Sequence, residues 1–165
     1  MRTLSPTEEE LLSRLMWFVK LRWIFLLALA AVIFVARNIL NLGLDPFPVV
    51  LILLLVLFYN LSFLCLHRRW ARSGRPITAR DLRIEGNLQI GLDLLALVIL
   101  VHYTGGIENP FTMFFFLHMI LGSILLTGMD IWVHAALTVV LLFSMLVLSY
   151  FGFADHHHIV GFASP

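Results

Sequence analysis

Long runs of apolar residues, separated by short polar segments, dominate the pattern along the chain. Five runs, residues 23–42, 47–66, 84–103, 111–127 and 131–153, are long enough for membrane helices, since crossing about 30 Å of hydrocarbon takes about 20 mostly apolar residues. The runs are continuous and do not alternate, so they predict helices rather than the strands of a barrel. The pattern therefore predicts an all-α fold, a polytopic membrane helical bundle with five transmembrane helices.

Composition agrees with a membrane protein. Of the 165 residues, 61% are hydrophobic and 13% are charged, and the mean hydropathy is +0.97. Soluble domains contain about half apolar and a quarter charged residues. The excess apolar surface must face lipid, which excludes a soluble globular domain. The N-terminus lacks a short apolar core with a small-residue cleavage site, so we expect no removable signal peptide.

The placement of positive charges predicts the orientation. Ten of the eleven lysines and arginines lie before the first run or between the second and third, and Arg37 is the exception. Loops rich in Lys and Arg stay on the cytoplasmic side. We therefore expect a cytoplasmic N-terminus, with the turn between the third and fourth runs outside. The arginine-rich loop at 67–83 suits anionic lipid head groups better than nucleic acid.

The chain divides into two predicted parts, a cytoplasmic amphipathic segment (1–22) and a transmembrane domain (23–165). We expect the first part to lie along the membrane surface. The residues expected to face lipid are Leu11, Leu12, Leu15, Phe18 and Val19. Five spans place the C-terminus outside, so we expect a fragment that lacks a following sixth span. The alternative is a complete protein with five spans.

The run 84–103 is the most polar of the five. Glu85 lies at its cytoplasmic end, where we expect it to be solvated, whereas Gln89 and Asp93 are four residues apart and share a helix face. An ionised carboxylate at the depth of Asp93 is costly unless it is paired or protonated. A hydrogen bond between helices, with Asn60 or Ser62 as partner, is the favoured interpretation. A proton or ligand site is the alternative.

Three histidines fall in or beside the later spans. His118 and His134 lie inside them, and His102 ends the third run. A neutral imidazole can donate to a ligand carbonyl, although a packing contact with a polar neighbour explains such a histidine equally well. Together with Asp93 they could line one site that faces outward. A different function would use Asp93, His118 and His134 as the path of a small proton- or ion-coupled transporter or channel subunit.

Two other features are given ordinary interpretations. Cys65 is the single cysteine, so no internal disulfide can form, and we expect a buried, inert thiol. The sequence "DHHH" at 155–158 suggests a metal, but adjacent side chains point in different directions. We expect no metal site there, and an interfacial, pH-sensitive loop instead.

The turn after the third run has an unusual composition. It reads "GGIENPF" from Gly105 to Phe111, and phenylalanines follow at 114–116. Gly105 and Gly106 permit close approach of another molecule, and Asn109 before Pro110 leaves an amide free to donate. Donors beside aromatic rings at the membrane boundary suit a lipid-soluble ring with carbonyl oxygens, such as a quinone. The alternative is a simple turn.

The same residues carry a resemblance to a known family. "GGIENPF" resembles the G-G-x-x-N-P-F heptad of RegB/PrrB-type redox-responsive sensor histidine kinases. The preceding "LDLLALVILVHYT" and the earlier "LRWIF" also look like that family's third span and first-span entry. The resemblance covers about residues 21–153. It implies six spans with both termini cytoplasmic and the heptad on the outer side, in agreement with the orientation inferred from charge.

The resemblance also implies a function. The chain would be the membrane input domain of a two-component kinase in the bacterial inner membrane, sensing the redox state of ubiquinone or menaquinone. The quinone would bind Gly105, Gly106, Asn109, Pro110 and Phe111, with His102, His118 and Asp93 as supporting residues. The domain would form a homodimer and reach a response regulator through a cytoplasmic kinase core that also binds ATP. No kinase motif is present in this chain, so no catalytic residue carries over.

Overall fold

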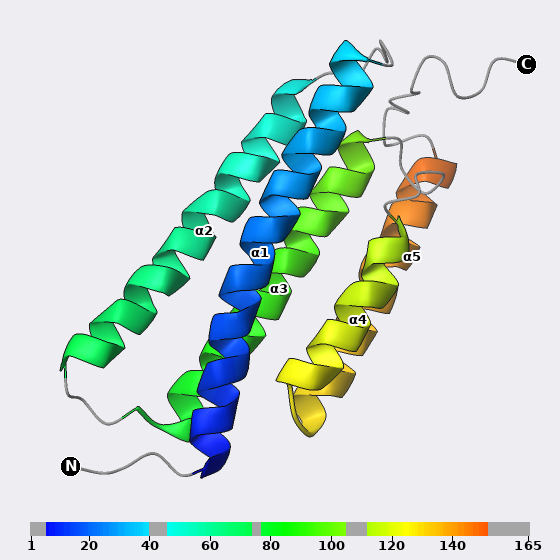
Figure 1. Ribbon diagram of the computed structural model, residues 1–165. Coiled ribbons are helices and arrows are strands. Elements are labelled where there is room, and N and C mark those ends of the chain that lie inside the picture. Colours follow the sequence, from blue (N-terminus) through cyan, green and yellow to red (C-terminus); the bar gives the residue numbers. More distant parts are fainter. Residues whose placement is uncertain (1–5, 40–45, 74–76, 105–111, 152–165) are drawn as a thin grey trace, which may run out of the picture.

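The computed structural model describes residues 6–39, 46–73, 77–104 and 112–151. These residues form five helices (Figure 1): α1 (Pro6–Asn38), α2 (Pro46–Ser73), α3 (Ala79–Tyr103), α4 (Met113–Leu125) and α5 (Met129–Tyr150). The predicted all-α membrane bundle is confirmed. Four helices are long and apolar enough to cross a membrane, whereas α4 is a shorter apolar helix of 13 residues. At 1.5 Å per residue, α4 is only about 20 Å long.

Local sequence explains where several helices begin. Pro6 and Pro46 are the first residues of α1 and α2, where the missing N–H of proline leaves no hydrogen bond unmade. Thr78 caps α3 in a reciprocal pair with Asp81, because each side chain accepts a hydrogen bond from the other's backbone N–H. Gly128 has φ +60° in the turn before α5, a left-handed conformation that glycine adopts without strain.

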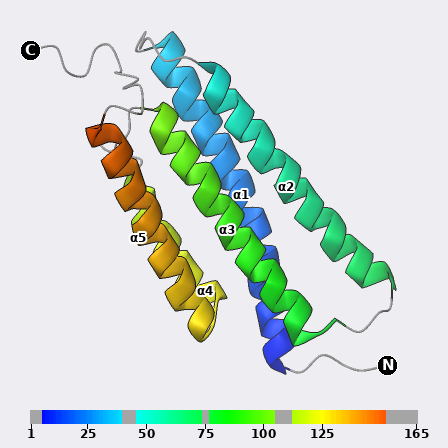
Figure 2. The ribbon, with the colours of Figure 1, turned by 180° about the vertical axis from the view of Figure 1, so that it is seen from behind.

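Helix α3 lies in the middle of the bundle. Figures 1 and 2 show α1 and α2 on one side of it and α4 and α5 on the other. Consecutive helices run in opposite directions. The start of α1, the end of α2, the start of α3 and the α4–α5 turn therefore share one end of the bundle. This is the alternation of sides that the charge pattern predicts, and the shared end is the expected cytoplasmic one.

The apolar core consists of three clusters, and α3 contributes to each. The first joins α1, α2 and α3 and includes Leu26, Val56 and Leu100. The second, near the expected cytoplasmic end, includes Leu15 and Leu82. The third packs α3 against α4 and α5. Most other large apolar side chains are exposed, as expected for residues that face lipid rather than water.

The N-terminal segment differs from the prediction. Helix α1 continues without a break from Pro6 through the first apolar run. Leu15, Phe18 and Val19 are buried against the other helices, so the expectation that they face lipid is wrong. Leu11 and Leu12 also pack against the cluster that contains Leu15. The apolar stripe of this segment is therefore part of the bundle core.

Two polar contacts join helices at the expected cytoplasmic end. Arg14 of α1 donates to the carbonyl of Ile124, one of the last carbonyls of α4, which have no partner within the helix. Arg83 of α3 forms a bidentate pair with Asp130 at the start of α5, with an Nη2–Oδ1 distance of 2.8 Å. Because both arginines are exposed, these contacts are of the kind that contributes modestly to stability.

Close packing at Gly86 provides a test of this arrangement. A Cβ atom built there would lie 3.7 Å from side-chain atoms of Leu15 and Leu126, an ordinary contact. We predict that Gly86→Ala keeps or raises the thermal stability of the purified chain in detergent, because alanine favours helix by about 1 kcal/mol. Gly86→Leu should lower it, because the added atoms overlap α1 and the end of α4. Equal melting temperatures for both variants would contradict this packing.

Candidate functional site

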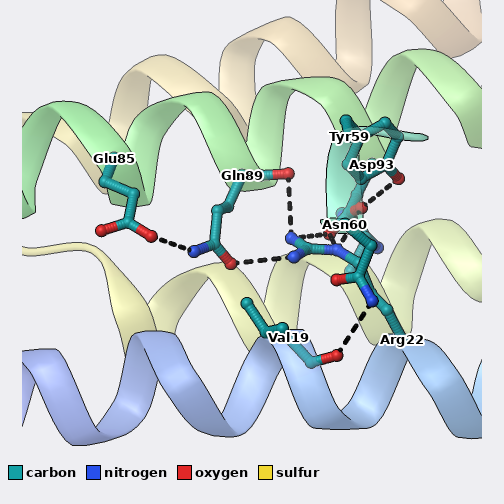
Figure 3. A network of polar contacts seen from close by, with 8 residues as sticks. Val19, Arg22, Tyr59, Asn60, Glu85, Gln89 and Asp93 are labelled. Carbon is teal, nitrogen blue, oxygen red and sulfur yellow. Dashed lines mark hydrogen bonds and ion pairs between the residues drawn. The ribbon is translucent and has the colours of Figure 1, made fainter. Parts of the chain in front are cut away.

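The most polar part of the bundle interior is a face of α3 that carries Glu85, Gln89 and Asp93 at intervals of four residues. Asp93 is paired with Arg22 of α1, as Figure 3 shows. The Arg22 Nε–Asp93 Oδ1 and Arg22 Nη2–Asp93 Oδ2 distances are both 2.7 Å. The two side chains are 6% and 11% exposed, so this is a buried, bidentate ion pair.

Helix α2 contributes to the same pair. Tyr59 donates its hydroxyl to Asp93 Oδ1 at 2.5 Å, and the Arg22 guanidinium lies 5.5 Å from the Tyr59 ring centre and 5.7 Å from that of Phe63. Aromatic faces at this distance attract a cation. One ion pair therefore joins α1, α2 and α3.

The predicted partners of Asp93 are wrong, although the predicted kind of contact is right. Asn60 donates to the backbone carbonyl of Val19, and Ser62 donates to Phe58 within its own helix. A hydrogen bond between helices does hold Asp93, but its partners are Arg22 and Tyr59. Arg22 is the partner because its guanidinium can donate to both carboxylate oxygens at once.

The polar chain extends from Arg22 toward the cytoplasmic end. Arg22 Nη1 donates to Gln89 Oε1 at 2.9 Å, and Gln89 Nε2 donates to Glu85 Oε1 at 2.8 Å. His67 of α2 lies with Nε2 2.8 Å from the same Glu85 oxygen. Glu85 is 2% exposed, so the expectation that it is solvated is wrong. It is buried because α2 continues past the predicted end of its span and covers it.

The positive and negative groups of this polar network are not equal in number. Arg22 is one positive charge against the two carboxylates of Asp93 and Glu85. Because Arg22 and Asp93 neutralise each other, Glu85 remains, with His67 beside it. Burying an uncompensated charge is costly, so the contact with His67 is part of what allows Glu85 to be buried.

A partly open pocket of about 220 Å³ lies next to the Arg22–Asp93 pair. Four helices line it. Its polar end consists of Arg22, Tyr59, Asp93 and His118, and its walls are almost entirely apolar. The apolar lining residues are Phe18, Leu21, Ile24, Phe25, Ala28, Ile52, Val56, Ala96, Leu97, Leu100, Phe114, Leu117 and Leu121. A concave apolar site with a few convergent polar groups is the usual form of a small-molecule site.

The opening of the pocket lies between α1 and α4. The exposed members of its lining are Ile24 and Ala28 on α1 and Leu117 on α4, whereas the lining residues on α2 and α3 are largely buried. Phe25 and Phe114 meet edge to face, with ring centres 6.1 Å apart. Because the exposed residues of these two helices face lipid, a lipid-soluble molecule could enter from the bilayer.

The structure brings together some of the predicted site residues. His118 Nε2 lies 3.9 Å from Asp93 Oδ2, so these two converge on the pocket. His102 does not line the pocket; its ring lies against that of Tyr103 at the end of α3. His134 Nε2 lies 3.0 Å from Asn87 Oδ1, away from the pocket. The role predicted for His102, His118 and Asp93 in ligand binding remains a prediction.

Other predicted features fall elsewhere. Gly105, Gly106, Asn109, Pro110 and Phe111 lie outside the described residues, as does the sequence at 155–158. Cys65 is exposed, so the expectation that its thiol is buried is wrong, because it lies on the face of α2 turned away from the bundle.

The sequence analysis did not single out Arg22 as a site residue. Its position one residue before an apolar run made it one of several cytoplasmic charges. A signal was available, because an acidic residue inside one span is usually paired with a polar or charged group of another, and Arg22 directly precedes the first apolar run.

The Arg22–Asp93 pair predicts a pattern in a double-mutant cycle. Asp93→Leu or Arg22→Met alone should destabilise the chain by about 3 kcal/mol, since each leaves one uncompensated buried charge. The double variant should be less destabilised than either single variant. Unfolding titrations of the purified chain in mixed micelles would measure this, with Arg14→Met as the control on the exposed part of α1. Additive losses would show that the two charges do not compensate each other.

Comparison with known proteins identifies the family. The sequence matches the family model described as the PilS-like transmembrane domain over residues 5–163. No match was found among curated proteins or among solved structures. The family is a membrane domain of the sensor-kinase type, in agreement with the multi-pass helical bundle described above. Because the match covers nearly the whole sequence, the chain belongs to the PilS-like transmembrane domain family and is a membrane sensor domain.

Proposed function

We propose that this domain senses the redox state of a membrane quinone and passes the signal to a histidine kinase. The observation that supports the proposal most strongly is the pocket between α1 and α4. It combines apolar and aromatic walls with a polar end and opens toward the lipid-facing surface. A quinone has a matching form, with a flat ring, polar oxygens and an apolar tail.

The GGIENPF heptad lies between two pocket-lining residues in the sequence. Leu100, near the end of α3, and Phe114, near the start of α4, both line the pocket, and the heptad at 105–111 lies between them in sequence. Gly105, Gly106, Asn109, Pro110 and Phe111 are proposed to contact the quinone. This is the RegB/PrrB-like part of the proposal, and it rests on the resemblance of the motif.

The proposed mechanism is a shift between two arrangements of the helices. The oxidised and reduced forms of a quinone differ in hydrogen-bond donors and acceptors, and only a difference in affinity for the two arrangements can shift their populations. A fivefold difference corresponds to about 1 kcal/mol, near the low end of ordinary coupling energies. The change would act on a homodimer, through a cytoplasmic kinase core that uses ATP and a response regulator, in the bacterial inner membrane.

A transporter or channel is the weaker candidate. Its path would need Asp93, His118 and His134 to exchange ions or protons. Asp93 is instead held by Arg22 and Tyr59, and His134 is bonded to Asn87 outside the pocket.

The heptad proposal predicts the effect of two substitutions. Asn109→Ala and Phe111→Ala should each weaken quinone binding by about fivefold or more, because they remove a donor or an aromatic surface. Titration of the purified chain in nanodiscs with a short-tailed quinone would measure this. Leu95→Ala is a matched control, since Leu95 is an exposed residue of α3. Unchanged affinity in both heptad variants would remove the heptad from the proposal.

A further inference from the structure

One buried nitrogen at the polar end of the pocket has no hydrogen-bond partner among the described residues. This atom is Nε2 of His118, on α4. Its distance of 3.9 Å from Asp93 Oδ2 is too long for a direct hydrogen bond. A single oxygen atom of another molecule can lie about 2.8 Å from both atoms, so the two groups are spaced to hold one small polar group between them.

Asp93 has capacity for one more donor. A carboxylate offers about four acceptor positions. Three donor hydrogens reach this carboxylate: the Tyr59 hydroxyl on Oδ1, Arg22 Nη2 on Oδ2, and Arg22 Nε, which lies 2.7 Å from Oδ1 and 3.0 Å from Oδ2. Because the Nε hydrogen is shared and lies nearer Oδ1, one acceptor position remains on Oδ2. Oδ2 is also the Asp93 oxygen that lies 3.9 Å from His118 Nε2. This acceptor position and the imidazole nitrogen therefore form one bridging site.

A hydroxyl group satisfies this bridging site better than a carbonyl does. A hydroxyl can donate to Asp93 Oδ2 and accept from His118 when Nε2 carries the proton. When Nε2 lacks the proton, the hydroxyl can still donate either to Nε2 or to Asp93 Oδ2. A carbonyl oxygen can only accept from His118, and it would then place its lone pairs against a carboxylate oxygen. The geometry therefore favours a ligand that carries an O–H.

The walls of the pocket favour an aromatic ring next to that hydroxyl. Phe18, Phe25, Phe114 and Tyr59 are among the lining residues. A cavity of about 150 Å³ in another protein holds a benzene molecule, so about 220 Å³ suits a substituted single ring. A tail attached to the ring would leave between α1 and α4, where Ile24 and Leu117 are exposed.

We propose that the polar end of the pocket is a binding site for the hydroxyl of a lipid-soluble quinol and prefers it to the corresponding quinone. This inference rests on the proposed function and adds the position of the head group and the redox form that is favoured. Asp93 lies about 15 Å along α3 from Tyr103, the last residue of the helix. The site therefore lies away from the end of α3 after which the heptad follows in sequence.

The preference can be measured as a ratio of dissociation constants. The purified chain in nanodiscs is titrated under anaerobic conditions with a short-tailed quinol, its quinone and its dimethyl ether, which has no O–H. We expect the quinol to bind at least fivefold more tightly than the other two, the equivalent of one hydrogen bond of about 1 kcal/mol.

Substitutions of His118 test the assignment to this site. His118→Phe should weaken quinol binding by at least fivefold, because Nε2 is one of the two groups that hold the hydroxyl. His118→Gln, which retains a polar group, should restore part of the affinity for the quinol. His134→Leu is the matched control, because His134 is an intramembrane histidine that does not line the pocket. It should leave the affinity for the quinol unchanged. Binding of the quinone itself reports that each variant is folded.

The outcomes separate this inference from the proposed function. Absence of binding of both redox forms to the native chain would overturn both. Equal binding of the two forms, or quinol affinity that is unchanged in His118→Phe, would overturn the bridging site alone and leave quinone sensing at the heptad in place. If a bound water bridges His118 and Asp93 in place of a ligand, the two redox forms should bind equally.

Discussion

A buried ion pair between Arg22 and Asp93 fixes the arrangement of the bundle. Neither charge can remain unpaired in apolar surroundings, so α1 and α3 must meet at this level and in this orientation. Tyr59 adds α2 to the same contact. Because charged groups are far more selective in their partners than apolar side chains are, this pair specifies one register among the many that leucine-rich helices could otherwise adopt.

The pocket follows from that constraint. With Arg22 turned toward α3, small residues of α1 and α3, Ala28 and Ala96, come to line the space beside the pair. Helix α4 packs mainly on α3 and α5 and approaches α1 at the outer side through Phe25 and Phe114. Space therefore remains between α1 and α4, and it ends at the same polar groups that hold the other three helices together.

The sequence predicted the fold well and the site only in part, for physical reasons. Five apolar runs give five helices because the length of a run is a local property. The shared face of Gln89 and Asp93 is also local. The roles of Arg22 and Glu85 are not, since a charged residue beside an apolar run is usually solvated, and here packing buries both. The pocket joins residues of four helices, so no local pattern could predict it.

The position of the pocket suggests how a ligand could act on the whole bundle. Asp93 already contacts α1 and α2, and His118 is the only polar lining residue on α4. A group that bridges Asp93 and His118 would tie α4 to the other three helices, whereas a group that cannot donate would leave that connection open. From Arg22, bonded polar groups continue through Gln89 to Glu85 and its neighbour His67, at the end of the bundle where the arginine-rich connection begins. A change in the attachment of α4 would therefore act on helices that these contacts join as far as the expected cytoplasmic side. If the ligand is the proposed quinone, only a difference in affinity between its two redox forms can produce such a shift, and the remaining acceptor position on Asp93 is where that difference would arise.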